Sequence, residues 1–222
     1  MLQENFINLT KELQQIVKQI PLHWGKVQND ETDAQLNIFK IDDYATLENA
    51  IANFDHETKN YFIKRWFIYK CAVCDEHIFC LNENATPNPQ KRDQTYDIEF
   101  NKNALLRFDI KGTLIPKQFR NNVEEVINKP KILINFFYEQ QSKGVRNSFQ
   151  NRLFIVHHSF KKQEREMMLR CHFDFKIKAF HSYATTINTT SQFMQYENAI
   201  ADIIFIFENI DGSFEWKIAS TI

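Results

Sequence analysis

Two short apolar segments between residues 96 and 113, which read YDIEFNKNALLRFDIKGT, each contain a carboxylate. Asp97 lies in the first segment, and Asp109 and Lys111 lie in the second. Side chains alternate between the faces of a strand, so Asp109 and Lys111 should point the same way, with Cα atoms roughly 6.5 Å apart. A paired neighbouring strand lies about 4.8 Å away. If pairing sets Asp97 beside Asp109, all three side chains converge on one patch.

This patch has the composition of a metal-assisted hydrolytic site. Two adjacent carboxylates repel each other, and one normally takes up a proton unless a cation relieves the conflict. Magnesium is commonly shared between one or two carboxylates, several waters and a substrate phosphate. Lys111 could then hold the attacking water or neutralise charge on the phosphate. The residues predict hydrolysis of a phosphodiester with Mg²⁺ as cofactor and Mn²⁺ as a substitute.

A third acid precedes these strands on a predicted long helix that begins at Asp55. Apolar side chains recur along it at spacings of four, three and four residues, at Phe62, Trp66, Tyr69 and Val73. Such a stripe indicates a buried helix face, and continuing it by three residues adds Glu76 to that face. Glu76 is therefore a candidate third ligand. Glu99 shares the strand face of Asp97 and is an alternative or additional one.

Asp97 followed by FDIK at residues 108–111 resembles the PD-(D/E)xK nuclease superfamily over roughly residues 60–210. The resemblance implies a restriction-endonuclease-like fold in which the first acid is on the second core strand and the acid–x–lysine triplet is on the third. It also implies metal-ligand roles for Asp97, Asp109 and Glu76, with Lys111 polarising the water. One departure is that Tyr96, and not proline, precedes the first acid.

The element pattern predicts an α/β protein with a mixed central sheet flanked by helices on both faces. We expect one domain over residues 1–222, with a helical extension at 1–58 and a nuclease-like core at 59–222. Later strands separated by helices should run parallel. Helices are predicted at 6–20, 43–54, 55–76, 117–127 and 164–184, and 131–141 is ambiguous. Strands are predicted at 77–84, 95–100, 104–112, 152–160, 201–209 and 214–220, with a further short strand at 29–43.

The charge distribution suggests a polyanion-binding face. Residues 61–180 carry 21 Lys+Arg against 13 Asp+Glu, whereas residues 1–60 carry 5 against 10 and residues 181–222 carry 1 against 5. Phosphate binding responds to the local field rather than the total charge, so DNA is the expected partner. The candidate backbone-contacting residues are Lys91, Arg92, Lys117, Arg120, Arg146 and Arg152. Symmetric cutting of two strands would favour a homodimer.

Composition bears on three other classes of protein: those with a glycine-rich phosphate loop, membrane proteins and zinc-binding modules. The chain has only 4 Gly and no glycine-rich phosphate loop, and no apolar run reaches membrane-spanning length, so we expect a cytoplasmic protein with no membrane partner. CAVCDEH offers Cys71, Cys74 and His77 as zinc ligands, which is the pattern of a zinc-stabilised interaction module. The other interpretation is that both cysteines are small buried residues of a helix.

Two alternatives to the nuclease hypothesis remain open on the sequence. Asp109 and Lys111 could form a surface ion pair on a solvated edge strand. The chain could also be a non-catalytic nucleic-acid-binding protein that retains the nuclease fold.

His157 and His158 end a predicted strand, and a histidine facing inward there is expected to be a satisfied core residue.

Overall fold

A computed structural model describes residues 3–21, 29–90, 95–141, 150–189 and 191–221. The chain divides into two compact units, Met1–Cys74 and Asp75–Ile222, and the boundary falls inside the long helix α4. Within the described residues, no helix is both long and apolar enough to cross a membrane.

The first unit is helical. It contains the helices α1 (Gln3–Ile16), α2 (Asp30–Asp33) and α3 (Tyr44–Ile51), and the greater part of α4 (His56–Phe79). The strand predicted at 29–43 is wrong, because this segment forms α2 and a 3₁₀ turn at Ile38–Lys40. Asparagine caps explain the difference: Asn29 accepts a hydrogen bond from the Thr32 amide at 2.7 Å, and Asn37 accepts one from Phe39 at 3.1 Å.

Helix α4 confirms the predicted buried stripe in its first half. Phe62 and Trp66 are fully buried, and the Trp66 indole donates to the Ile41 carbonyl at 3.0 Å. Tyr61, next to this stripe, donates its hydroxyl to Asp33 at 2.6 Å. These contacts fasten α4 within the helical unit, and the same helix then carries the chain into the second unit.

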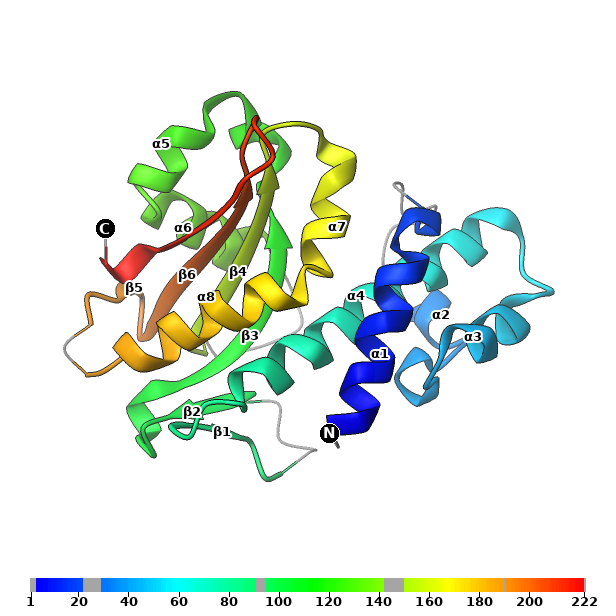
Figure 1. Ribbon diagram of the computed structural model, residues 1–222, viewed down its shortest axis with the longest axis horizontal. Helices are drawn as coiled ribbons and strands as arrows, with labels where there is room; N and C mark the ends of the chain where they lie inside the picture. Colours follow the sequence, from blue (N-terminus) through cyan, green and yellow to red (C-terminus); the bar gives the residue numbers. More distant parts are fainter. Residues whose placement is uncertain (1–2, 22–28, 91–94, 142–149, 190, 222) are drawn as a thin grey trace. The chain divides into compact units, whose positions relative to one another are not determined.

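The second unit is built on a mixed sheet (Figure 1), as predicted for an α/β protein. Its strands run in the order β1-β2-β3-β4-β6-β5, and β7 also pairs with β6. Strands β3, β4 and β6 are parallel, as expected for strands joined through helices, and the other pairs are antiparallel. The strands are β1 (Ala85–Pro87), β2 (Ile98–Phe100), β3 (Arg107–Leu114), β4 (Arg152–Ser159), β5 (Met194–Tyr196), β6 (Ala199–Glu208) and β7 (Phe214–Ile218).

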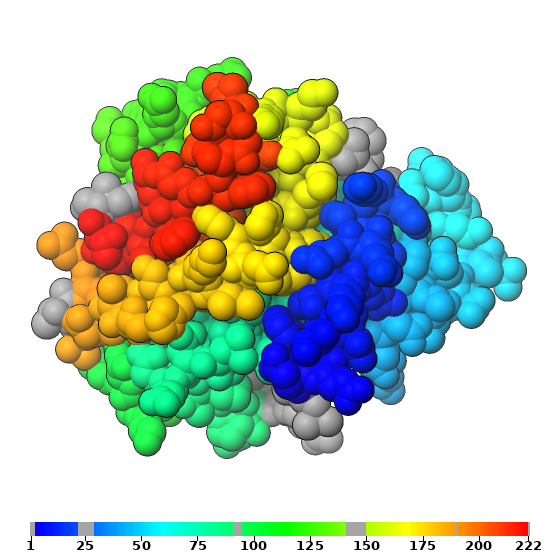
Figure 2. Space-filling model, in the orientation of Figure 1, coloured from blue at the N-terminus to red at the C-terminus, as the bar shows by residue number. Residues whose placement is uncertain are grey.

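Helices cover both faces of this sheet (Figure 1). Helices α5 (Val123–Asn128) and α6 (Lys131–Gln141) share a buried core with Phe154 and Val156 of β4. Helices α7 (Glu166–Arg170) and α8 (Phe173–Thr186) lie on the other face, where α7 contacts β4 and α8 contacts β6 and β7. Figure 2 shows α7 and α8 in yellow beside β7 in red. The arrangement is the predicted sheet flanked by helices.

Two of the predicted elements are wrong at positions where a helix ends. The strand predicted at 77–84 is wrong, because α4 continues to Phe79 and Asn82 then caps it by donating to the Phe79 carbonyl at 3.0 Å. The single helix predicted at 164–184 is split into α7 and α8 at Cys171 and His172. Lys176 donates to the Arg170 carbonyl at 3.2 Å, so a side chain satisfies the end of α7 in place of the continuing helix.

Candidate metal and active site

Asp97 lies immediately before β2 and close to Asp109 of β3. In the antiparallel ladder between β2 and β3, Ile98 pairs with Phe108. The Asp97 amide also donates to the Phe108 carbonyl, at 2.9 Å, so Asp97 and Ile98 both lie opposite Phe108 and the regular ladder ends here. The Asp97 carboxylate also turns back to β3, where its Oδ2 accepts a hydrogen bond from the Ile110 amide at 2.7 Å. Asp97 is thus fixed at the edge of β3.

Asp109 and Lys111 form a pair in which only the lysine reaches solvent. Lys111 Nζ lies 2.6 Å from Asp109 Oδ1, and the two side chains are 39% and 4% exposed respectively. Arg152, the neighbour of Asp109 on β4, places Nε 3.6 Å from Asp109 Oδ2. Because Asp109 is buried between two cations, the pair is not the solvated edge-strand ion pair of the first alternative.

Aromatic packing positions Glu76 in the last turns of α4. Phe79 stacks on Phe180 of α8 with ring centroids 4.2 Å apart, and it meets Phe100 of β2 edge-on at 5.7 Å. Phe100 in turn contacts Phe108, so α4 ends on the face of the sheet opposite to the one from which Asp109 and Lys111 project. Among the charged neighbours of Glu76, Asp97 has the largest effect on its pKa.

Burial and charge repulsion raise the pKa values of two acids in this group. Burial, followed by repulsion from Asp97, raises the pKa of Glu76 to about 8, and Lys111 opposes that rise. Burial, followed by repulsion from Asp109, raises the pKa of Asp97 to about 6. Both acids therefore hold protons more tightly than an isolated carboxyl does, which is the behaviour of carboxylates that a cation would stabilise in their charged form.

The donor set fits a shared ion better than a closed protein cage. In the described parts of the chain, no three Asp, Glu, His or Cys side chains are gathered closely enough to hold a metal by themselves. Magnesium does not require such a cage, because one or two carboxylates with waters and substrate phosphate are its usual ligands. Asp97 and Asp109 meet that requirement, and Glu76 lies within electrostatic range of both.

The other predicted acid and the basic residues are dispersed. Glu99 pairs with Arg107, its partner across the β2–β3 ladder. Lys117 is exposed at the start of a 3₁₀ turn before α5. Arg120 pairs with Glu166, and Arg152 is 6% exposed, with its guanidinium 4.8 Å from the centre of the Tyr138 ring. Both arginines thus serve internal contacts in the fold. Lys91, Arg92 and Arg146 lie outside the described residues.

The cysteine motif does not form a zinc knuckle. Cys71 and Cys74 are buried on α4, and His77 follows on the same helix. Since the described residues contain no cluster of three potential metal ligands, the geometry agrees with small buried residues on a helix rather than a zinc module.

A buried ion pair next to Glu76 escaped the sequence reasoning. Lys176 of α8 is fully buried and forms an ion pair with Asp75, whose side chain is 3% exposed. Burial raises the pKa of Asp75, and Lys176 opposes that rise. Lys176 lies between Phe173 and Phe180 on the apolar stripe of its helix, the same kind of signal that singled out Glu76.

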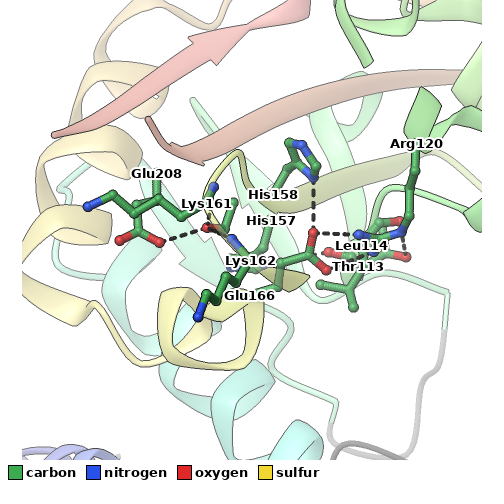
Figure 3. Close-up of polar contacts among 10 residues, drawn as sticks. Thr113, Leu114, Arg120, His157, His158, Lys161, Lys162, Glu166 and Glu208 are labelled. Carbon is green, nitrogen blue, oxygen red and sulfur yellow. Dashed lines mark hydrogen bonds and ion pairs between the residues drawn. The ribbon is translucent and has the colours of Figure 1, made fainter. Parts of the chain in front are cut away.

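A second polar cluster lies at the carboxyl ends of β3 and β4 (Figure 3). The fully buried Glu166 accepts two hydrogen bonds from Arg120, at 2.8 and 2.7 Å, and lies 3.0 Å from Nδ1 of His158. Burial alone would raise the pKa of Glu166, but the contacts with His158 and Arg120 hold it below its ordinary value. His157 is a buried core histidine, with Nδ1 3.2 Å from the Thr113 carbonyl, but its hydrogen bonding is only partly satisfied because Nε2 has no partner among the described residues.

Comparison of the chain with protein-family models, curated proteins and solved structures found no match in any of the three.

Proposed function

We propose that this protein is a magnesium-dependent nuclease that hydrolyses phosphodiester bonds in DNA. The observation that carries the proposal is the placement of Asp97 beside Asp109, where the Ile110 amide holds its carboxylate, with Lys111 bonded to Asp109 and Glu76 electrostatically linked to Asp97. A restriction-endonuclease-like fold is part of the proposal. The order of α4, β1 to β3, α5 and α6, then β4 is the one that the resemblance to the PD-(D/E)xK superfamily leads us to expect.

In this mechanism the protein positions charge and the ion supplies Lewis acidity. Asp97 and Asp109 would hold the cation, and the charge of Glu76, which is coupled most strongly to Asp97, would add to the attraction for it. When bound, magnesium lowers the pKa of a coordinated water and polarises the phosphate. The 39% exposed Lys111 can turn part of its hydrogen-bonding capacity from Asp109 toward that water or toward a phosphate oxygen.

Proton balance ties the proposed site to pH. Glu76 and Asp97, with pKa values raised to about 8 and about 6, must lose their protons to bind a cation well. Deprotonation becomes more complete as the pH rises across that interval. Metal affinity and metal-dependent cleavage should therefore both increase from pH 6 to pH 8.5.

The proposed partners follow from the same site. DNA is the expected substrate, a homodimer would suit cutting of both strands, and a cytoplasmic location is part of the same proposal. Of the described basic candidates, Lys117 is the exposed one, so we expect it to contact the phosphate backbone.

The test is incubation of purified protein with plasmid, linear and branched DNA in Mg²⁺, in Mn²⁺ and in excess chelator. We expect cutting of at least one DNA that chelator abolishes and that Lys111→Ala removes. Lys217→Ala is the matched control, because Lys217 also lies near a carboxylate, Glu215 at 3.7 Å, and is similarly exposed at 44%. The proposal fails if none of the three DNAs is cut in either metal.

A second candidate function is non-catalytic DNA binding, and one observation favours it. Asp109 is flanked by Lys111 and by Arg152, so two cations already offset its charge without a metal. Under this alternative, the protein binds DNA equally well with Mg²⁺ and with chelator, and Lys111→Ala leaves binding unchanged. Electrophoretic mobility shift of the same DNAs separates the two functions.

A further inference from the structure

A cavity of about 500 Å³ opens at the amino ends of β3, β4 and β6. Three parts of the chain line it: residues 104–106 before β3, Asn151 before β4, and a third set in and around β5 and the start of β6. The third set consists of Thr189, Ser191, Gln192, Phe193, Gln195, Asn198 and Ile200. Its volume falls in the range of small-molecule pockets, about 300–1,000 Å³. The cavity belongs entirely to the sheet-containing unit.

Asn151 connects this cavity to the candidate active site. Its backbone carbonyl accepts the Asp109 amide at 3.0 Å. Its side chain joins two walls of the cavity, because Oδ1 accepts the Ile200 amide at 3.0 Å and Nδ2 donates to the Leu105 carbonyl at 3.4 Å. A group bound in the cavity would thus lie next to the strand end that carries Asp109.

The lining selects the chemistry of the ligand. None of the described residues that line the cavity carries a formal charge, so the lining offers neither a phosphate nor a metal ion a charged partner. Gln192, Gln195 and Asn198 present exposed amides, each able to donate and accept hydrogen bonds. Phe193 adds a partly exposed ring, which packs against the Phe108 ring with centroids 5.7 Å apart. Amides beside an aromatic face suit a neutral, planar group with donors and acceptors.

We propose that this cavity receives the base of an unpaired nucleotide adjacent to the phosphodiester that the proposed nuclease cleaves. Amide side chains pair with base edges, and aromatic rings stack on base faces. A base inside an intact duplex cannot reach such a cavity without leaving the stack. This inference rests on the proposed function and narrows it to DNA that has an unpaired nucleotide beside the cut.

Binding can be tested without cleavage. A single-stranded oligonucleotide that carries 2-aminopurine is titrated with the full-length protein in excess chelator, and its fluorescence is followed. We expect quenching on binding, and a roughly tenfold loss of affinity in Gln195→Ala/Asn198→Ala, because contacts between amides and a base edge are worth about that factor. Phe193→Ala should abolish the quenching. Gln118→Ala is the control, since Gln118 is an exposed amide on the 3₁₀ turn before α5.

The outcomes separate this inference from the proposed function. If the protein cuts DNA in Mg²⁺ but the amide double variant binds and cuts as the unaltered chain does, the pocket assignment is overturned and the nuclease stands. If quenching depends on Phe193 and on both amides while no DNA is cut, the pocket stands and the nuclease is overturned. Abasic sites in place of the bases that flank 2-aminopurine should weaken binding if the cavity receives a base. Unchanged binding to the abasic oligonucleotide would overturn the inference.

Discussion

Glu166 is fully buried and Glu76 is partly buried in the sheet-containing unit, and their neighbours have opposite charges. Glu166 is surrounded by Arg120 and His158, and its pKa is held below the ordinary value despite burial. Glu76 is surrounded mainly by acids, and burial with repulsion from Asp97 raises its pKa to about 8. The first carboxylate already has its countercharge within the fold, whereas the second is in a position that a cation from solution would stabilise.

Two Asp–Lys pairs among the described residues of this unit differ in a similar way. Lys176 and Asp75 are 0% and 3% exposed, so their charges are satisfied by each other inside the protein. Lys111 and Asp109 are 39% and 4% exposed, so this lysine can leave its partner for a ligand. Buried pairs of the first kind hold elements in place, and pairs of the second kind can take part in chemistry. The predictions below test this division.

The largest effect is expected at the buried pair. Lys176→Met leaves Asp75 without its countercharge, which should lower the free energy of unfolding by about 3–5 kcal/mol in urea denaturation. Asp75→Asn/Lys176→Met should recover much of the loss, because both charges are then removed together. Lys178→Met is the control, as Lys178 is an exposed lysine of the same helix. A loss of under 1 kcal/mol for Lys176→Met would remove the structural role from this pair.

The pair of Lys111 and Asp109, in which only the lysine is exposed, should show the reverse pattern. Lys111→Ala is expected to lower the rate of metal-dependent cleavage by about 10²–10³-fold, the usual cost of losing one charge-stabilising donor. Its free energy of unfolding should change by at most about 1 kcal/mol, as for other partly exposed ion pairs. Single-turnover cleavage and urea denaturation are the two measurements. Equal losses in both would show that Lys111 serves the fold and not the reaction.

Arg120→Ala should sharpen the contrast between the two glutamates. It removes two hydrogen bonds to the buried Glu166, and we expect a loss of about 2–3 kcal/mol in the free energy of unfolding at pH 7. Binding of Mg²⁺ should stay within twofold of the unaltered protein, measured by isothermal titration. A large fall in Mg²⁺ affinity would place this cluster, and not Glu76, nearest the ion.

A pH-dependent change in stability is expected from Glu76. Its pKa is about 8 in the folded chain and close to 4.5 when unfolded, so the native state keeps a proton that the unfolded state releases between these values. Stability from this group is present below pH 4.5 and is lost as the pH rises to 8. Glu76→Gln, which stays neutral, should show no such loss when urea denaturation is measured across that interval.

The same variant tests the role of Glu76 toward the ion. At pH 8.5, Mg²⁺ should raise the melting temperature of the unaltered protein more than that of Glu76→Gln, because the ion relieves repulsion that the variant lacks. Glu83→Gln is a control at an exposed acid of the same chain region. Identical metal-induced shifts in the two proteins would exclude Glu76 as a ligand.

Local periodicity predicted much of the second unit. Strand alternation placed Asp109 and Lys111 on one face of β3, and the helical stripe carried Glu76 along α4, because both patterns depend only on neighbouring residues. The mixed sheet and its parallel later strands also followed from the element order. The helix break at Cys171 and His172 did not, since Lys176 reaches back to the Arg170 carbonyl through a contact that periodicity does not encode.

Long-range pairing accounts for what the sequence left undetermined. Arg152 looked like a surface residue ahead of a strand, but the register of β4 on β3 buries it beside Asp109. Arg120 likewise meets Glu166, which is 46 residues away in the chain. The cavity beside Asn151 is assembled from three separated segments, so no single stretch of sequence announces it.

The Asp97 carboxylate accepts the hydrogen bond of the Ile110 amide. In a longer β2, a backbone carbonyl would accept that bond. A change at position 97 should therefore loosen the sheet edge and disable the chemistry together, whereas a change at position 111 touches chemistry alone. Under the proposed mechanism, a descendant that lost only Lys111 would still fold and still hold DNA. A nuclease and a non-catalytic DNA-binding protein with this fold would then differ by one substitution.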